Sequence, residues 1–430
     1  MTNLKSLSKP CILVDYENSV YYCYDDNNTV FTSNDLNNWT KLSSTLPLLT
    51  HMSVIKVRNE YRIYGEKDGK IYLYVSTSPE RDFILRDRVI GPEDTDMDYG
   101  ISYTSPFIFC DPLSKDHFLI YKRGKYDIFS LHINPRNGLS FEETPGTLVA
   151  CMPEYNDSIN HGSMYYSKEY GLYYLFISSG NEFSGSIRYG VSSKPNGIFK
   201  DFSGKELTDK NNFDDSLGFM PLAPMHFDDC DYVNSYVKPA LFNGTDNKTY
   251  FSCLAYTVPE STYSLPEFHN RTGCITSFMI EPVYNTGDSH IPFLMLPYGI
   301  SPDFDHTNDS HATEDIAGHY EYICLKKLFP LSICDYTELS VLSTTDNGVS
   351  STRNSWALSI PHTSGGHVEL GGSLRGYWLF NNRQLLIRYN NYTQYFNILK
   401  VKINSTDTIT TFLIGTDSQG NVVMAKKFRS

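Results

Sequence analysis

Lys238-Pro239-Ala240-Leu241-Phe242 is one of five segments in which a polar residue and a compact residue precede an apolar run. The other four begin at Lys9, His51, Ser105 and Asn160. After each segment come a turn and a second stretch dense in Tyr or Phe. A unit that returns at intervals of some tens of residues predicts radial or stacked β-sheets. In radial sheets the residues that open the units face a central pocket.

The fourth repeat shows the expected plan of one sheet most clearly. Short stretches of alternating or aromatic residues are separated by Gly, Pro, Asn and Asp, which punctuate antiparallel strands. The expected strands, from the innermost outward, are Ser163–Ser167, Leu172–Ser178, Ser186–Ser192 and Ile198–Phe202. Four such strands form one blade of a β-propeller, in which only short and protected sheet edges remain.

The pattern changes near residue 300. Residues 301–317 are polar and rich in turn formers, so we expect a linker there between a domain of residues 1–300 and a domain of residues 318–430. The second domain lacks the repeated segment, and its strands are expected at Gly318–Leu325, Ser355–Ile360, Leu385–Tyr389, Phe396–Ile403, Thr408–Ile414 and Val422–Lys426. The sequence thus predicts an all-β chain, a five-bladed β-propeller followed by a small C-terminal β-barrel or β-sandwich.

Composition supports a β-fold and narrows the choice of partners. Of the 430 residues, 14% are aromatic, mostly Tyr and Phe, which favour pleated and half-buried surfaces. The formal net charge of −13 argues against nucleic acid and against an anionic membrane as partners. A neutral polysaccharide or oligosaccharide fits this charge, and the sequence gives no indication of a protein partner.

The cysteines and the first residues of the chain indicate where the protein is located and whether it binds zinc. The chain has 9 Cys, none in a C-x-x-C pair, so a zinc site is not expected and the thiols are expected to be free. The segment Met1–Ser8 lacks the apolar core of a secretory signal, and no apolar run reaches transmembrane length. We therefore expect an intracellular or particle-associated protein rather than a classically secreted one.

Several stretches resemble the family 43 glycoside hydrolases, and in particular the two-domain arabinan-degrading members. The likeness is diffuse and covers nearly the whole chain, and its most specific part is the fourth repeat with Tyr173-Tyr174-Leu175-Phe176. The similar stretches are Ser33–Thr40, Lys125–Gly138, Ser163–Asp201 and Cys274–Tyr298. The resemblance implies a five-bladed propeller with a small β-domain, and it implies activity on arabinan or a related polysaccharide.

In that family three carboxylates open the innermost strands of blades one, three and four. An inverting glycosidase needs an acid for the leaving oxygen and a base for the attacking water, roughly 6.5–9.5 Å apart. The corresponding positions here are Lys9, Ser105 and Asn160, or His161 in place of Asn160 if the register slips by one. None of these residues is a carboxylate, and the loss of both acid and base should abolish useful turnover.

Two acidic loops offer replacement carboxylates. Asp98 ends the run Glu93–Asp98 before the third repeat, and Asp231 ends the run His226–Asp231 before the fifth. Inter-blade loops can lie on the pocket face, so both residues are candidate catalytic substitutes. The alternation of Asp in the first run is a weak calcium signal, because the Gly and the distant Glu of an EF-hand loop are missing. No other cofactor is expected.

Three functions remain open at this point. The first is a glycan-binding or structural protein, a pseudoenzyme on a hydrolase-like scaffold. The second is an active glycoside hydrolase with relocated carboxylates, and the third is an assembly protein, for example of a virion, with a vestigial pocket. The candidate sugar-binding residues are those that open the repeats, namely Lys9, His51, Ser105, Asn160, His161 and Lys238.

Overall fold

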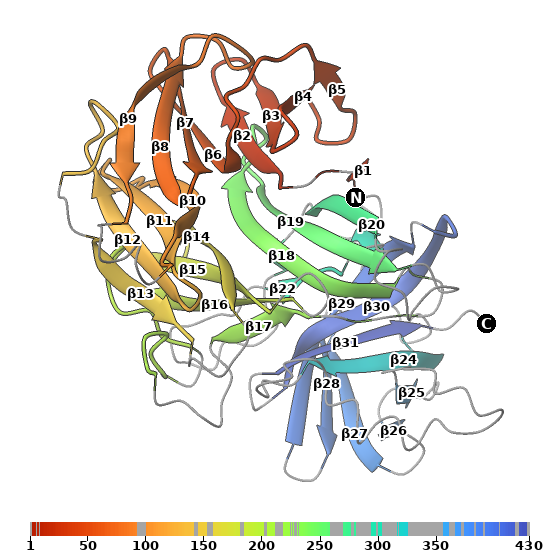
Figure 1. Ribbon diagram of the computed structural model, residues 1–430. Helices are drawn as coiled ribbons and strands as arrows, with labels where there is room; N and C mark the ends of the chain where they lie inside the picture. Colours follow the sequence, from red (N-terminus) through yellow and green to blue (C-terminus); the bar gives the residue numbers. More distant parts are fainter. Residues whose placement is uncertain are drawn as a thin grey trace.

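The computed structural model of the protein consists of β-sheets arranged in two parts (Figure 1). The residues described are 2–5, 7, 9–92, 100–141, 145–152, 158–180, 185–201, 204–210, 218–223, 225, 227, 230, 232–258, 270–276, 279–280, 294–297, 300–302, 316, 318–325, 356–360, 366–370, 374–381, 384–389, 392–403, 405–417 and 421–427. Within these ranges no helix is long and apolar enough to cross a membrane.

The first part is a five-bladed propeller, as the repeats predicted. Its first four blades are four-stranded antiparallel sheets whose strands follow one another in chain order. They are β2 (Cys11–Asp15), β3 (Val20–Asp25), β4 (Thr29–Ser33) and β5 (Thr40–Leu42); β6 (Thr50–Val57), β7 (Glu60–Lys67), β8 (Lys70–Ser76) and β9 (Ile84–Ile90); β10 (Tyr103–Cys110), β11 (His117–Arg123), β12 (Asp127–Ile133) and β13 (Thr147–Cys151); and β14 (Ile159–Ser167), β15 (Leu172–Ser179), β16 (Ser186–Ser192) and β17 (Phe219–Leu222).

The fifth blade combines both ends of the propeller sequence. It contains β18 (Tyr232–Asn243), β19 (Thr249–Val258), β20 (Asn270–Thr276) and, as its outer strand, β1 (Thr2–Lys5). The pairing runs from Thr2 opposite Ile275 to Lys5 opposite Thr272. Because β1 precedes the first blade in the chain, this pairing closes the ring and covers the edge of β20.

The outer strand of the fourth blade differs from the prediction. The segment Ile198–Phe202 was expected there, but β17 at Phe219–Leu222 takes this place and pairs with β16. Lys200 forms only isolated bridges, with Val191 and with Glu206. The predicted segment is short and lies directly after a tight turn, so it bends back to β16 without extending along it.

Buried tyrosines link the blades. Tyr24 in β3 donates its hydroxyl proton to the Pro79 oxygen of blade 2 at 2.7 Å. Tyr64 in β7 does the same to the Gly138 oxygen of blade 3 at 2.9 Å. Both rings are fully buried. Tyrosine combines an apolar ring with a hydroxyl that needs a partner, so much of the tyrosine content serves sheet packing.

The second part is a closed β-barrel. Its strands form a nine-stranded sheet in which β29 also pairs with β30, so that all of them except β23 complete a ring. The strands are β23 (Ile300–Pro302), β24 (Gly318–Leu325), β25 (Trp356–Ile360), β26 (Gly366–Leu370), β27 (Leu374–Asn381), β28 (Gln384–Tyr389), β29 (Tyr392–Ile403), β30 (Thr408–Asp417) and β31 (Val422–Lys427). A pair of short strands, β21 (Met279–Ile280) and β22 (Leu294–Met295), precedes them.

The barrel begins slightly earlier than the predicted domain. Ser301 and Pro302 stand at the start of the expected linker, but they belong to β23 and pair with β29. The closing pair β29–β30 decides between the two alternatives for this part, because a sandwich would leave the two sheets open at their edges.

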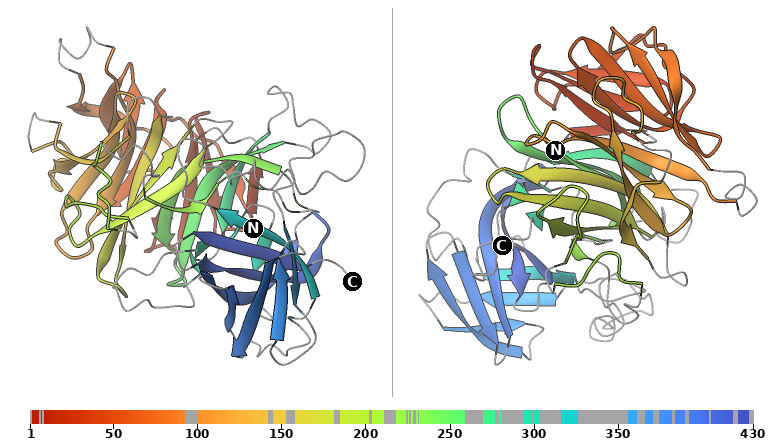
Figure 2. Two further views of the ribbon diagram at one scale, coloured as in Figure 1. Left: turned by 90° about the horizontal axis from the view of Figure 1, so that it is seen from below. Right: turned by 90° about the vertical axis from the view of Figure 1, so that its left-hand side faces the viewer.

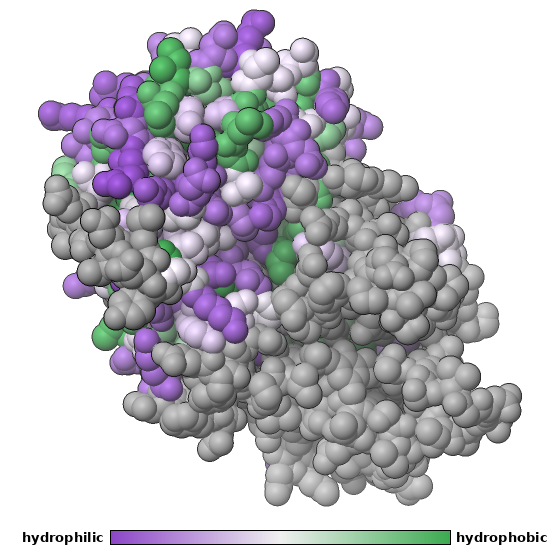
Figure 3. Space-filling view, viewed as in Figure 1, coloured by the Kyte–Doolittle hydropathy of each residue, from purple (hydrophilic) through white to green (hydrophobic). Residues whose placement is uncertain are grey.

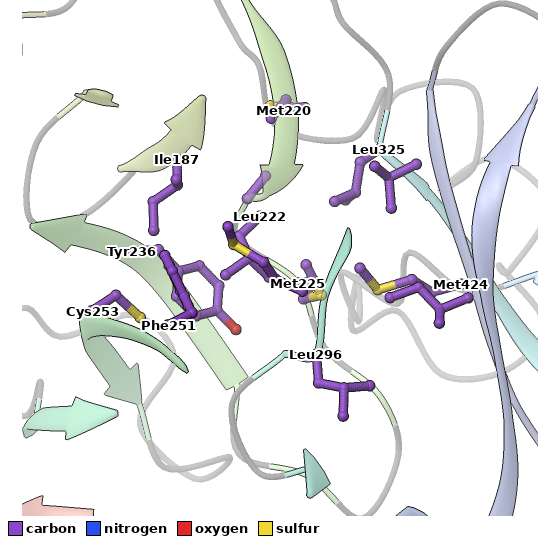
Figure 4. Close-up of a cluster of buried hydrophobic side chains, with 14 of the residues drawn as sticks. Ile187, Met220, Leu222, Met225, Tyr236, Phe251, Cys253, Leu296, Leu325 and Met424 are labelled. Atoms are coloured by element: carbon purple, nitrogen blue, oxygen red, sulfur yellow. The ribbon is translucent and has the colours of Figure 1, made fainter. Parts of the chain in front are cut away.

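The barrel packs against blades 4 and 5 of the propeller, and Figures 1 and 2 show the blue barrel strands beside the green strands of blade 5. Figure 4 shows the shared core, in which Met220 and Met225 of the propeller approach Leu325 and Met424 of the barrel. The rings of Phe227 and Phe412 meet edge to face at 5.5 Å. One continuous apolar cluster therefore joins the two parts.

The visible surface is largely polar. On the face in Figure 3, hydrophilic residues predominate over the described blades, with apolar residues scattered among them. Single exposed apolar side chains, such as Ile84 and Leu113, are ordinary on soluble proteins.

Candidate functional site

Four innermost strands carry an irregularity where their repeat opens. The register shifts between Thr50 and Ser53 in β6, between Thr104 and Phe107 in β10, between Ile159 and His161 in β14, and between Val237 and Ala240 in β18. Each shift places an opening residue, namely His51, Ser105, Asn160 or Lys238, in a bulge. A β-bulge turns side chains away from the regular alternation.

Three of these residues have left-handed backbone conformations. The φ angles are 51° for His51, 53° for Ser105 and 55° for Lys238. The other described non-glycine residues with positive φ lie outside the strands. Such a conformation costs a residue with a side chain about 1–2 kcal/mol. Strain repeated at equivalent places of three blades points to a functional site.

Lys9, His51 and Ser105 form a connected chain at the axis. Lys9 Nζ lies 2.6 Å from His51 Nε2, and His51 Nδ1 lies 3.0 Å from Ser105 Oγ. A protonated Lys9 can only donate, so the His51 ring proton belongs on Nδ1 and is donated to Ser105. Ser105 is only 1% exposed. Its hydroxyl therefore orients His51 and is not free to attack a ligand.

The fifth and fourth blades complete this cluster. Lys238 Nζ donates to the main-chain oxygen of Lys9 at 2.6 Å. His161 is buried, and its ring packs edge-on against Phe107 at 6.2 Å. Asn160 is held differently, because its amide donates to the Gly180 oxygen and its Oδ1 accepts from Ser158. The structure thus gathers Lys9, His51, Ser105 and Lys238 by direct contacts, whereas Asn160 bonds to its own blade.

Two carboxylates that the sequence analysis missed reach the same cluster. Asp26 lies 3.7 Å from Lys9 Nζ and accepts a hydrogen bond of 2.9 Å from the His51 main chain. Glu66 lies 3.8 Å from His51 Nε2. A third acid, Asp25, accepts from the Lys9 main chain at 2.7 Å. The cluster therefore contains acidic groups, although none of them opens a repeat.

These acids come from the second strands of the blades. The ladder pairs Cys11 with Tyr24, which places Asp26 across from Lys9, and it pairs Thr50 directly with Glu66. In the third blade the same position is Lys122, the partner of Thr104. The sequence could have indicated these acids, because in an antiparallel hairpin the end of the second strand lies beside the start of the first.

Burial and like charges control protonation at the cluster. Burial, followed by the positive charges of Lys9 and Lys238, lowers the pKa of His51 well below its ordinary value. Burial and Lys238 lower the pKa of His161 in the same way. Burial also lowers the pKa of Lys9, although Asp26 opposes this, and burial raises the pKa of Glu66. Both histidines are therefore neutral at pH 7.

The proposed replacement acids Asp98 and Asp231 lie outside the described residues, as do Asp94 and Asp96 of the weak calcium signal. The part of the chain that is described contains no group of three or more His, Cys, Asp or Glu able to hold a metal ion. Cys11, Cys23, Cys110 and Cys151 are free thiols.

The opposite end of the central channel holds a cavity of about 680 Å³. It is lined by the far ends of the five innermost strands, with apolar side chains such as Val14, Ile55 and Phe242. Phe107 lines this cavity and also contacts His161, so its ring lies between the cavity and the polar cluster. The titratable residues that open the repeats belong to the other mouth, which is the candidate site.

Solved structures share this architecture over its full length. A family 43 glycoside hydrolase, the YxiA protein of Bacillus licheniformis, matches with a TM-score of 0.75 and 16% identity, covering 100% of this chain and 99% of that one. Endo-1,5-alpha-L-arabinanase from Thermotoga petrophila RKU-1 matches with a TM-score of 0.74 and 16% identity, covering 100% of both. No protein-family model matches the chain, and no curated protein does.

The propeller alone also has a neighbour with a ligand. The alpha-L-arabinanase of Cellvibrio cellulosa, solved in complex with arabinohexaose, matches with a TM-score of 0.52 and 14% identity, covering 68% of this chain and 96% of that one. At such identities the comparisons establish the fold. The chain has the fold of the family 43 glycoside hydrolases, and specifically that of the arabinanases with a C-terminal β-domain, which confirms at this level the resemblance seen in the sequence.

Proposed function

We propose that this protein binds a polysaccharide or oligosaccharide in the central pocket and does not hydrolyse it by the two-carboxylate mechanism. The proposal rests on the chemistry of Lys9, Ser105 and Asn160, which the resemblance places at the family's three carboxylate positions, those of the base, the orienting Asp and the acid. Serine and asparagine cannot act as general acid or general base at neutral pH, and a protonated Lys9 cannot accept a proton from the attacking water. The arabinohexaose complex of a similar propeller supports an oligosaccharide as the ligand class.

The hydrogen bonds of the pocket suit sugar hydroxyls. One oxygen of Asp26, Oδ1, is buried and accepts no hydrogen bond from the described residues. Glu66 and Lys9 are partly exposed, with 18% and 35% of their side-chain surfaces accessible. The pocket floor thus offers acceptors and a donor held in place by the first two blades, which is what recognition of a hydroxylated ring requires.

A second candidate function is hydrolysis with Asp26 and Glu66 as relocated acid and base. It has some support, because burial raises the pKa of Glu66 and a general acid needs a raised pKa. The geometry is less favourable, since Lys9 lies against Asp26 and His51 lies against Glu66. Lys9 and His51, 2.6 Å apart, are thus the side chains that contact the two acids, where an inverting enzyme needs room for a water.

The test compares binding with turnover on the same material. The purified protein is incubated with linear arabinan and with aryl arabinofuranosides, and reducing ends are measured beside binding by titration calorimetry. Binding without product supports the proposal. Product that disappears in both Asp26→Asn and Glu66→Gln would establish the second candidate instead.

The third possibility, an assembly role, is also tested. If the protein neither binds nor cleaves any glycan on a broad array, the proposal is wrong and the pocket is vestigial.

The control for substitutions at the site is Lys248→Met. It removes a half-exposed lysine on the β18–β19 turn, with 52% of its side chain accessible. This variant should bind sugars as the unmodified protein does.

A further inference from the structure

We propose that the sugar bound in the central pocket is acidic, and that its anionic group, a carboxylate or a sulfate ester, lies beside Lys238 and His161. This inference rests on the proposed function, because it names the ligand class of the same site. It changes the expectation drawn from composition, since the net charge of −13 favoured a neutral polysaccharide.

The charges of the pocket are divided between its two sides. On the side of blades 1 and 2, Lys9 lies 3.7 Å from Asp26, and Glu66 lies 3.8 Å from His51. On the side of blade 5, the hydrogen bond of the Lys238 ammonium goes to the uncharged main-chain oxygen of Lys9. No carboxylate among the described residues lies within 4.0 Å of Lys238 Nζ.

Lys122 is a third lysine of this region. It stands at the end of β11 across from Thr104, beside the bulge of Ser105. Its side chain is partly buried and forms no ion pair within 4.0 Å in the part of the chain that the structure describes, although the charge of Glu66 acts on it. A partly buried ammonium without a carboxylate partner is costly unless an anion joins it. Among the described residues the carboxylates of Asp25, Asp26 and Glu66 all lie on the side of blades 1 and 2, so it is beside Lys238 that a negative charge is missing.

His161 supplies a second and independent observation. It is 4% exposed, and its Nδ1 atom has no hydrogen-bond partner among the described residues. Buried polar atoms are nearly always satisfied. The edge-on contact with Phe107 fixes the ring, and burial together with the charge of Lys238 keeps it neutral, so that one ring nitrogen can donate to an anion.

The backbone of Lys238 indicates that this cation is positioned for use. Its φ of 55° within strand β18 is strained, and the residue after it is a proline. A lysine at a solvated surface needs no such conformation. Together with the free oxygen of Asp26 on the other side, the pocket offers an acceptor for hydroxyls and a cation for an acid, the two features that an acidic sugar ring combines.

The experiment compares acidic with neutral ligands, and the central pair is trigalacturonate and its methyl ester, which share one sugar chain. Trigalacturonate, its methyl ester and a sulfated disaccharide are titrated against the full-length protein by calorimetry, with arabinotriose as the neutral reference. We expect the free acid or the sulfate to bind roughly 10- to 100-fold tighter than the neutral sugars, because a hydrogen bond to a charged group contributes that much. Lys238→Met should remove this preference, whereas Lys248→Met should keep it.

The outcomes separate this inference from the proposed function. If neutral sugars bind as tightly as charged ones, or if Lys238→Met keeps the preference, the inference is wrong and the proposed function stands. If no sugar binds at all, both fail. Preference for the uronate alone or for the sulfate alone identifies the anion. A circular dichroism spectrum and melting temperature of Lys238→Met matching those of the unmodified protein show that its fold is intact.

Discussion

The ammonium of Lys238 donates a 2.6 Å hydrogen bond to the main-chain oxygen of Lys9, which joins the last blade of the propeller to the first at the central axis. At the outer rim the same two blades are joined by the pairing of β1 with β20. The ring is therefore closed twice, once by a side chain at the site and once by a strand at the edge.

Removal of residues 2–5 should destabilise the propeller. The deletion exposes the edge of β20 and removes the backbone hydrogen bonds of the four residue pairs of β1, each contributing about 1 kcal/mol. We expect a loss of roughly 2–4 kcal/mol in the free energy of unfolding, measured in urea, and a greater tendency to aggregate. An unchanged urea midpoint would show that β1 does not stabilise the ring.

Gly415→Ala should open the barrel. A Cβ atom at this position would lie 1.6 Å from the Tyr395 main-chain oxygen, on the partner strand that closes the ring. The strands would have to separate, at a cost of roughly 3 kcal/mol. The control is Gly171→Asn, at a turn with φ of 64° where nothing lies within 4 Å of the new Cβ, since Asn tolerates such a conformation. Equal melting temperatures for the two variants would contradict the prediction.

His161→Phe should change the response of stability to acid. Burial lowers the pKa of His161 in the folded state, so the unfolded chain binds its proton first as the pH falls below the ordinary value of 6.5. The folded state of the unmodified protein therefore loses stability, by about 1.4 kcal/mol between about pH 7.5 and 5.5. His161→Phe lacks this loss. Its free energy of unfolding should therefore rise relative to that of the unmodified protein as the pH falls. Parallel stability curves for the two proteins across this range would refute it.

Phe412→Ala should destabilise both parts of the molecule together. Phe412 of the barrel meets Phe227 of the propeller at 5.5 Å within one apolar cluster. We expect a loss of about 3–5 kcal/mol and a single calorimetric transition at a lower temperature. Ile409→Ala, on the same strand but 55% exposed, should change stability by less than about 0.5 kcal/mol. Two separate transitions in the unmodified protein would mean that the parts unfold independently.

Local sequence pattern predicted much of the fold. The opening residues His51, Ser105 and Lys238 stand in the strands that surround the axis, as the repeat indicated. The strands expected at Gly318–Leu325 and Val422–Lys426 lie within one residue of β24 and β31. Both results follow from the alternation of side chains in strands and from turn residues, which are properties of neighbouring positions.

The pairing of strands far apart in the chain could not be predicted from the sequence. Strand β1 joins β20 only because the ring brings the two ends of the propeller together, and nothing near Thr2–Lys5 indicates that partner. The choice of a barrel over a sandwich likewise depended on a distant pairing, that of β29 with β30. At the site, Asp26 and Glu66 open no repeat and reach the cluster only across the ladder from the first strands, so the repeated segments did not indicate them.

The bulges at His51, Ser105 and Lys238 set the direction of a side chain through the main chain alone. The type of side chain at these positions is thus independent of the direction in which it points. A single substitution can exchange the chemical group at the axis while the sheets stay unchanged. Such a ring can lose one chemistry and acquire another in few evolutionary steps. For protein engineers it is a scaffold in which recognition is changed at three positions without redesign of the fold.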